Sequence, residues 1–199
     1  ILKLSHKRKK NTDKIIWITG ATSGIGEALA YALSEKGAKL ILSARRVEEL
    51  ERVKSTCKGE ALLLPLDLCR MQEFELLTQK VITHYGRIDY LINNGGISQR
   101  SEAFETPLEL DRKIMEVNYF GNIALTKAVL PQMQKQKSGT IVVISSLSGK
   151  FGFFLRSAYS ASKFALVGFY ESLRLEEEKN DIKVSIVFPG FIQTAISEN

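Results

Sequence analysis

The chain has 199 residues, of which 44% are hydrophobic, 25% are charged and 9% are aromatic, and its formal net charge is +6. This ordinary mixture excludes a collagen-like or wholly disordered chain, and the length suits one domain with a sizeable core. Two cysteines and two histidines are too few for a disulfide framework or a zinc site, so we expect no metal and a reducing, cytoplasmic location.

The N-terminus holds most of the net charge. Residues 1–14 contain six Lys or Arg and one Asp, which leaves a net charge of only +1 for the remaining 185 residues. We interpret residues 1–13 as a basic arm, either solvated or foreign to the native protein; contact with nucleic acid or an anionic membrane surface is the alternative. No aromatic residues lie between its charges, as single-strand binding would require, so we expect no nucleic-acid partner. Because the chain begins at Ile1 and not Met, a preceding anchor, and with it membrane association, stays open.

Short apolar runs then alternate with longer stretches of helical periodicity. The first run, residues 15–19, does not alternate with polar residues, which is typical of a strand buried on both faces. No apolar run approaches the roughly 18–20 residues that cross a bilayer. The patterns predict further strands at 39–43, 61–65, 88–93, 140–145 and 183–188, and helices at 25–37, 47–57, about 74–81, 108–117, 119–137 and 158–179. This order predicts parallel strands joined by right-handed crossovers, in one doubly wound, Rossmann-type α/β domain of three layers over residues 14–199.

A glycine-rich turn, Thr19-Gly20-Ala21-Thr22-Ser23-Gly24-Ile25-Gly26, follows the first strand and opens the first helix. Gly20 allows a tight turn, Gly24 lets the backbone approach a pyrophosphate, and Gly26 lets the helix pack against the sheet. The unpaired N–H groups and the positive dipole end of the helix then face the phosphates. A turn without a ligand is the alternative, but its place between strand and helix favours a nucleotide. The residues that we predict to bind it are Gly20, Thr22, Ser23, Gly24, Ile25 and Gly26.

The spacing of this turn, T-G-x-x-x-G-I-G, resembles that of the short-chain dehydrogenase/reductase family. The later motifs follow in the family's order, so the resemblance covers nearly the whole chain after Lys14. It implies a nicotinamide cofactor and transfer of a hydride between that cofactor and a secondary alcohol, ketone or aldehyde.

The residues after the second strand, Ala44, Arg45 and Arg46, bear on the choice of cofactor. A fold that binds NAD would place an acid here, against the ribose 2′-hydroxyl. A guanidinium instead suits a 2′-phosphate, so we predict NADP(H) in preference to NAD(H), bound through Arg45 and Arg46. The alternative is that Arg46 merely begins a solvated helix. Many relatives that use NADP also carry a basic residue within the glycine turn, where this chain has Ser23.

Two further segments match family positions along the nucleotide. Asp67 matches an acid that contacts the adenine, with a helix N-cap as its alternative role, and Leu68 follows it. Asn93-Asn94-Gly95-Gly96 resembles the family's N-N-A-G stretch, in which small residues let the backbone pass the cofactor and the amides hold the neighbouring strands. The resemblance therefore assigns Asp67, Leu68, Asn93 and Gly95 to the nucleotide site.

Tyr159 and Lys163 are four residues apart in a predicted helix, and therefore lie on one face of it. A phenol with a pKa of about 10 is a poor base near neutral pH, but a neighbouring ammonium stabilises the phenolate and lowers that pKa. Alone, this spacing is common and would be a surface pair. After the glycine turn, the resemblance implies that Tyr159 is the acid/base and that Lys163 tunes it and binds the nicotinamide ribose.

The resemblance assigns two more catalytic residues. Ser146 lies 13 residues before Tyr159, and its hydroxyl would polarise the substrate carbonyl. Asn118 matches a residue that holds a water in a proton relay toward Lys163. After the last strand, Pro-Gly-Phe-Ile-Gln-Thr resembles a segment that closes over the nicotinamide, although a strand-terminating turn is the alternative. Its expected contacts are Pro189, Gly190, Ile192 and Thr194.

The segment Phe151-Gly152-Phe153-Phe154-Leu155 suggests a bulky apolar substrate, with packing in the core or between subunits as the alternative. Other segments, such as Asn118-Tyr119-Phe120-Gly121, resemble the branch that contains 11β-hydroxysteroid dehydrogenase and the dehydrogenase/reductase members 7 and 7B, together with bacterial relatives. This branch handles varied lipophilic carbonyls and does not fix one substrate.

Family members continue past the sixth strand into a substrate-covering lid and a further strand, so we expect the domain to be incomplete at its C-terminus. Relatives pair through the helices that correspond to 108–137 and 158–179, which implies a homodimer or homotetramer. The alternative to an enzyme is an NADP-binding sensor or regulatory protein without turnover. Such a protein would more naturally have lost one of Asn118, Ser146, Tyr159 and Lys163, all of which are present.

Overall fold

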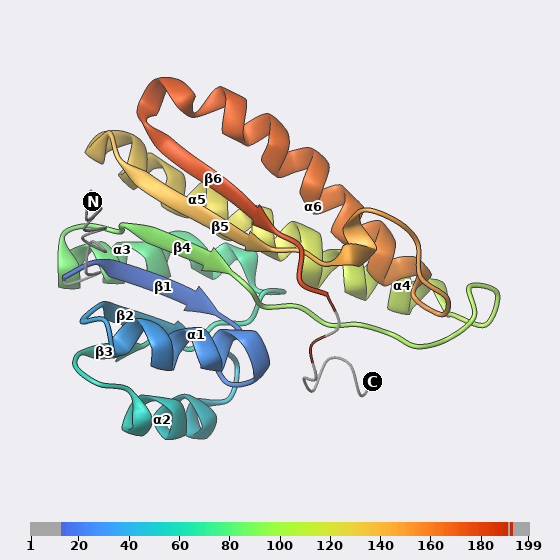
Figure 1. Cartoon of the computed structure of the whole chain (residues 1–199), viewed down its shortest axis with the longest axis horizontal. Helices are drawn as coiled ribbons and strands as arrows, with labels where there is room; N and C mark the ends of the chain where they lie inside the picture. Colours follow the sequence, from blue (N-terminus) through green and yellow to red (C-terminus); the bar gives the residue numbers. More distant parts are fainter. Residues whose placement is uncertain (1–12, 191, 193–199) are drawn as a thin grey trace, which may run out of the picture.

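A single parallel sheet organises the computed structural model, which describes residues 13–190 and residue 192 (Figure 1). Its six strands lie in the order β3-β2-β1-β4-β5-β6. In chain order they are β1 (Ile15–Thr19), β2 (Lys39–Ser43), β3 (Ala61–Leu63), β4 (Tyr90–Asn93), β5 (Gly139–Ile144) and β6 (Ile182–Val187). In the register, Ile16 of β1 lies between Leu40 of β2 and Tyr90 of β4. The strand order changes direction between β1 and β4, which is where sheets of this kind bind ligands.

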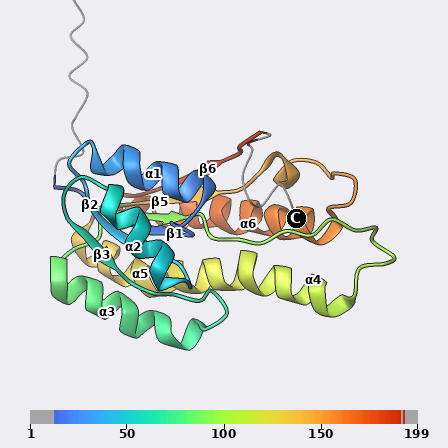
Figure 2. The ribbon, with the colours of Figure 1, turned by 90° about the horizontal axis from the view of Figure 1, so that it is seen from below.

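Helices cover both faces of the sheet, which makes three layers (Figure 2). One face carries α1 (Gly24–Ser34) and α2 (Val47–Thr56). The other carries α3 (Phe74–Tyr85), α4 (Leu108–Met115), α5 (Gly121–Gln136) and α6 (Ser157–Glu176). The doubly wound fold predicted from the sequence is confirmed. Within the described part of the chain, no helix combines the length and the apolar character needed to cross a membrane.

Alternate residues of the inner strands enter two different cores, which explains the uninterrupted apolar runs. Ile16 and Ile18 of β1 pack in the cluster beneath α1 and α2, whereas Ile15 and Trp17 pack in the larger cluster beneath α3, α5 and α6. Trp17 is fully buried, and its indole Nε1 donates a hydrogen bond to Ser43 Oγ at 2.8 Å. Burying each such side chain stabilises the fold by about 1.5–3 kcal/mol.

The ends of several elements differ from the sequence prediction, each for a local reason. The chain does not break between helices at Asn118, because a π-helical turn, Glu116–Phe120, joins α4 to α5. β3 ends at Leu63, two residues before Pro65, which has no N–H for the ladder. The helix predicted to reach residue 179 ends at Glu176 and is followed by a short 3₁₀ turn, Glu178–Asn180.

Lys14, the first residue of the predicted domain, is held by a buried residue that directly precedes β4. Its Nζ lies 3.3 Å from Oδ1 of Asp89, a buried carboxylate that also accepts a hydrogen bond from Ile15 N at 2.9 Å. The basic residues within the arm of residues 1–13 lie outside the described residues, so its role stays a prediction.

Candidate active site

A cleft of about 420 Å³ opens at the carboxyl ends of β1, β4, β5 and β6. It brings together four segments that are far apart in the sequence: the glycine turn, the loop after β4, the loop between β5 and α6, and the end of β6. Of the residues predicted from the sequence, the lining includes Gly20, Ser23, Gly24, Ile25, Gly95, Ser146, Tyr159, Lys163, Pro189, Gly190 and Ile192. Thr194 lies outside the described residues.

The glycine turn has the backbone geometry that only glycine tolerates well. Gly20 and Gly24 have φ angles of +62° and +54°, in the left-handed region that L side chains rarely adopt. A Cβ on Gly26 would lie 2.2 Å from the carbonyl oxygen of Gly20 and 2.5 Å from Asn94 Nδ2. Gly26 therefore lets the first turn of α1 sit directly against the loop, as the sequence predicts.

Asn94 and Thr19 hold the glycine turn against the loop after β4. Asn94 Nδ2 donates to the carbonyl oxygens of Thr19 and Gly20, at 3.0 and 3.1 Å. Thr19 Oγ1 in return accepts from the backbone N–H groups of Asn94 and Gly95, both at 3.0 Å. These contacts fix the floor of the cleft, and they give Asn94 the strand-bridging role that the sequence predicts for an amide in this motif.

Asn93 lies on the opposite side of the sheet from this floor. Its side chain is fully buried and donates to Thr126 Oγ1 at 2.8 Å and to Tyr170 Oη at 3.0 Å, so it does not reach the cleft. The Asn93 amide thus joins β4 to α5 and α6, and the assignment of Asn93 to the nucleotide site stays a prediction. Leu68 lies beneath the same loop, because a Cβ on Gly95 would be 2.8 Å from its Cδ1.

The residues assigned to the adenosine end lie beside the cleft rather than in its wall. Arg45 and Arg46 are exposed just after β2, where Arg46 is the N-cap of α2. Asp67 is half-buried, and its Oδ1 accepts from Cys69 N at 3.0 Å. This bond closes a turn between β3 and α3, so Asp67 does not act as the N-cap of α3, which is Glu73.

Ser146 and Tyr159 meet at the inner end of the cleft. Ser146 follows β5 and its Oγ accepts from Ser148 N at 3.1 Å, which fixes the side chain. Tyr159 stands in the first turn of α6. Burial raises the pKa of its phenol, whereas a hydrogen bond with Ser146 and the charge of Arg156 act in the opposite direction. The net direction is opposite to the lowering that the sequence predicts for Tyr159, because burial outweighs these contacts.

Lys163 lies one helical turn further, behind the tyrosine ring. It is buried, its Nζ donates to the carbonyl oxygen of Ile144 at 2.9 Å, and Nζ lies 5.5 Å from the centre of the Tyr159 ring. Burial lowers the pKa of its ammonium to about 8. The spacing predicted from the sequence therefore does place both side chains on one face, with the ammonium close to the ring.

This buried ammonium predicts a stability that rises with pH. An unfolded lysine titrates at a pKa of about 10.4, so between about pH 8 and pH 10.4 the unfolded chain binds more protons than the folded one. Stability should be lowest below the folded pKa and should rise toward the unfolded one. The difference between the pKa of Lys163 in the unfolded and in the folded chain corresponds to about 3 kcal/mol in the free energy of unfolding. Urea unfolding of the parent and of Lys163→Met, at about pH 7 and pH 10.4, measures it. We expect the parent to gain about 3 kcal/mol relative to the variant, and parallel pH profiles would contradict the assignment.

Asn118 is buried in the π-helical turn and does not line the cleft directly. Its Oδ1 accepts from Ile97 N at 2.8 Å, and its Nδ2 donates to Ile97 O at 2.9 Å and to Ser162 Oγ at 3.0 Å. A Cβ on Gly96 would lie 3.1 Å from this Oδ1 and 3.9 Å from Lys163 Nζ. Asn118 thus ties the loop after β4 to α6 within reach of the lysine, and a π turn at this place is typical of functional sites.

The cleft also contains residues that sequence reasoning did not assign. They are Asn94, Gly96, Ser98, Arg100, Ile144, Ser145, Leu147, Ser148 and Arg156. Phe153 and Phe154, from the aromatic segment that the sequence connects with the substrate, also line the cleft. Behind them, buried Gln99 accepts from Tyr159 N through Oε1 at 3.2 Å, and so fixes the start of α6. Several of them could have been found from the sequence only because they lie next to a predicted site motif, either the Asn-Asn-Gly-Gly stretch or Ser146.

Comparisons with known proteins agree with this geometry. Residues 14–199 match the family model described as short chain dehydrogenase. The chain is 46% identical to "Dehydrogenase/reductase SDR family protein 7-like" of Anopheles gambiae, over 100% of this chain and 65% of that protein. It is 48% identical to "Dehydrogenase/reductase SDR family member 7" of Homo sapiens, over 94% of this chain and 58% of that protein. The chain thus spans less than two thirds of the length of these curated relatives.

Solved structures share the same arrangement. A short-chain dehydrogenase from Streptomyces avermitilis superposes with a TM-score of 0.88 at 38% identity, covering 93% of this chain and 68% of that one. Levodione reductase superposes with a TM-score of 0.91 at 30% identity, covering 94% of this chain and 75% of that one. The fold, the order of the motifs and these matches together place the chain in the short-chain dehydrogenase/reductase family.

Proposed function

We propose that the protein is an NADP(H)-dependent oxidoreductase that interconverts a secondary alcohol with a ketone, or a primary alcohol with an aldehyde, acting on bulky apolar substrates. The observation that carries this proposal is the convergence of Ser146, Tyr159 and Lys163 on a cleft shared with the glycine turn. A phenol, a hydroxyl and an ammonium at one end of a nucleotide-sized groove are the groups that carbonyl reduction needs.

The cleft fits a nicotinamide dinucleotide by its own geometry. The left-handed Gly20 and Gly24 leave the backbone open at the N-terminus of α1, whose N–H groups and dipole favour a pyrophosphate. Gly95 and Gly96 keep the facing wall free of side chains. Pro189, Gly190 and Ile192 close the side nearest β6. When bound, the nicotinamide would supply hydride chemistry, and Lys163 would bind its ribose.

In the direction of reduction, the protein's residues handle the proton and the developing charge. The Ser146 hydroxyl donates a hydrogen bond to the substrate carbonyl oxygen and favours the negative charge that develops on it. The Tyr159 phenol donates its proton to that oxygen as the hydride reaches the carbon, which leaves an alcohol and a phenolate. Lys163 stabilises the phenolate, and Asn118 holds the loop and helix that position the lysine. Oxidation follows the same path in reverse.

The proposed preference for NADP(H) over NAD(H) depends on the residues that follow β2, above all Arg45. The backbone N–H of Ala21 donates to Ser43 O at 3.2 Å, so the glycine turn is tied to the strand end that carries Arg45. Removing the guanidinium by Arg45→Ala should weaken NADPH binding by about tenfold or more and NADH binding much less, because only NADPH carries the 2′-phosphate. Fluorescence titration of both cofactors measures this, with the exposed Arg70→Ala as the control. Equal loss for the two cofactors, or none, would contradict the preference.

Deuteride transfer tests the reaction itself. The protein is incubated with NADPH that carries deuterium at both hydrogens of the nicotinamide C4 and with a panel of bulky ketones and aldehydes, and the alcohols are analysed by mass spectrometry. The proposal expects deuterium on the former carbonyl carbon of at least one product. Products without deuterium, or no alcohol from any carbonyl, would refute it.

We further propose that two copies pair through the surface of α4, α5 and α6. Apolar side chains on this surface support the pairing, because Leu108 is 57%, Phe120 45% and Phe164 46% exposed. Size-exclusion chromatography with light-scattering detection would give the molecular mass in solution, and a monomer at all concentrations would refute the proposal.

A further inference from the structure

Two arginines line the cleft on the loops that adjoin the acid/base residue Tyr159. Arg100 comes from the loop after β4 and Arg156 from the loop that leads into α6, and both line the cleft together with Tyr159. The phosphate-binding turn belongs to a different segment, at the N-terminus of α1. The two guanidinium groups therefore lie on the side of the acid/base residue, where the substrate would enter, and not on α1.

The protein fixes the guanidinium of Arg156 in place. Its Nη1 donates to Ser98 Oγ at 2.5 Å and to Gln99 O at 2.7 Å. The two loops are also joined by a hydrogen bond from Ser101 N to Leu155 O at 3.3 Å. Since Gln99 in turn accepts from Tyr159 N, the arginine is held in a defined position relative to the first turn of α6. Such anchoring orients a guanidinium at little entropic cost.

The charged side chains that the described residues contribute to the cleft are positive. Among the described residues that line the cleft there is no Asp or Glu, whereas Arg100, Arg156 and Lys163 contribute three cationic side chains. Burial lowers the pKa of Arg156, and the charge of Arg100 lowers it further, so the two arginines repel one another across the groove. An anion between them would relieve this repulsion, and a planar carboxylate matches the fork of a guanidinium.

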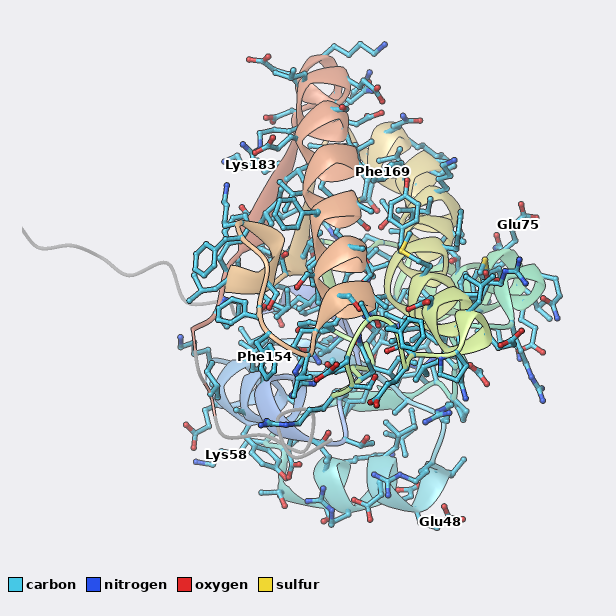
Figure 3. The ribbon with its side chains drawn as sticks, turned by 90° about the vertical axis from the view of Figure 1, so that its right-hand side faces the viewer. Glu48, Lys58, Glu75, Phe154, Phe169 and Lys183 are labelled. Carbon is cyan, nitrogen blue, oxygen red and sulfur yellow. The ribbon has the colours of Figure 1, made fainter. Side chains whose placement is uncertain are left out.

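Aromatic side chains form the adjoining wall. Phe153 and Phe154 both line the cleft, and Phe154 is 82% exposed where it projects from the loop before α6 (Figure 3). Phe151 packs against Phe153 with ring centres 5.1 Å apart. A ligand bound in this cleft beside Tyr159 can therefore contact both an apolar wall and a pair of cations. A molecule with an apolar body and one anionic group satisfies both surfaces.

We propose that the substrate class of this site is bulky, apolar carbonyls or alcohols that carry an anionic group, of which a carboxylate is the simplest, bound by Arg100 and Arg156. The inference rests on the proposed oxidoreductase function for the identity of the reacting group. It adds that charge, and not apolar contact alone, selects the substrate.

The test compares one ligand in charged and uncharged form. Calorimetric titrations with 5-oxo-5-phenylpentanoate and with its methyl ester are carried out on the protein saturated with NADP⁺, in which no hydride is available for reduction. We expect the carboxylate to bind about tenfold or more tightly than the ester, because the ester retains the phenyl ketone and loses only the charge. Arg100→Ala and Arg156→Lys should each reduce this ratio toward one.

A charge-matched variant controls for the loss of one cation. Lys135→Ala removes one exposed positive charge from the last turn of α5, just before β5 begins and so away from the cleft at the carboxyl ends of the strands, and should keep the ratio of the parent protein. Circular dichroism melts identify variants that fail to fold, and for these Arg100→Gln or Arg156→Gln replaces the first choice. Equal affinity for the two ligands in the parent, no binding of either, or a ratio unchanged in folded Arg100 and Arg156 variants would each overturn the inference.

The outcome is separable from that of the proposed function, because binding is measured without turnover. A carboxylate preference that disappears in the Arg100 variant supports the charged site even where deuteride transfer is absent. Conversely, reduction of ketones by a protein that binds acid and ester equally leaves the oxidoreductase standing and refutes only the anion site.

Discussion

Substitution Tyr159→Phe is expected to lower kcat by about a thousandfold while NADPH binding is retained. The change removes only the phenol oxygen, which is the atom that donates the proton to the substrate, and general acid catalysis contributes about 10²–10⁴ in rate. The ring stays in place over Lys163, whose Nζ lies 5.5 Å from its centre, so the nucleotide side of the cleft should be preserved. Steady-state rates with NADPH and fluorescence titration of NADPH give the two quantities.

The control removes another phenol oxygen from the same protein. Tyr31 lies near the end of α1 and donates to Glu27 Oε1 at 2.6 Å, outside the cleft. Tyr31→Phe should keep kcat within about twofold, since surface substitutions of this kind change stability by only about 0.5 kcal/mol. Comparable activity of Tyr159→Phe and the parent would remove Tyr159 from the mechanism.

Substitution Gly26→Ala is expected to destabilise the domain by about 2 kcal/mol and to weaken NADPH binding by about tenfold or more. The new methyl would lie 2.2 Å from the backbone carbonyl of Gly20 and 2.5 Å from Asn94 Nδ2, so the glycine turn itself has to move. Alanine favours a helix by about 1 kcal/mol over glycine, which offsets only part of this clash. Urea unfolding and NADPH titration measure the two effects.

A second helical glycine provides the matched control. A Cβ on Gly168, in α6, would meet no atom within 4 Å. Gly168→Ala should therefore raise stability by about 0.5–1 kcal/mol through helix propensity alone, and leave the affinity for NADPH unchanged. If Gly26→Ala and Gly168→Ala change stability and NADPH affinity in the same way, close packing at Gly26 does not fix the conformation of the glycine turn.

The fold was predictable because the central strands, such as β1, are apolar on both faces and the helices have a helical period of apolar residues. Two-sided burial of β1 between two cores is what the run from Ile15 to Thr19 indicates, and the structure has it. The break predicted at Asn118 was wrong because a π turn differs from an α turn by a single residue of winding, which periodicity does not resolve.

Only those parts of the candidate site whose geometry follows from a fixed spacing of residues along the chain could be predicted from the sequence. Tyr159 and Lys163 share a helix, so four residues of separation decide their geometry. Arg100 and Arg156 come from loops 56 residues apart, and only the tertiary structure brings their guanidinium groups to one groove. Asn93 and Asn94 are neighbours whose side chains lie on opposite sides of the sheet, and no spacing says which of them enters the core.

The direction of the Tyr159 pKa shows the same limit. A nearby ammonium is visible in the sequence, whereas the burial that raises the pKa depends on the loops packed around α6. Charge pairs follow from spacing, but desolvation follows from the whole fold.

A single cuvette experiment tests the central claim most directly. NADPH is titrated into the protein until its fluorescence change saturates, and bulky ketones and aldehydes are then added in turn while the nicotinamide signal is followed. The account predicts saturable binding at one NADPH per chain and a carbonyl-dependent loss of the reduced nicotinamide, catalysed by the parent and not by Tyr159→Phe. Saturable binding followed by no loss with any carbonyl, or equal loss with Tyr159→Phe, would contradict it.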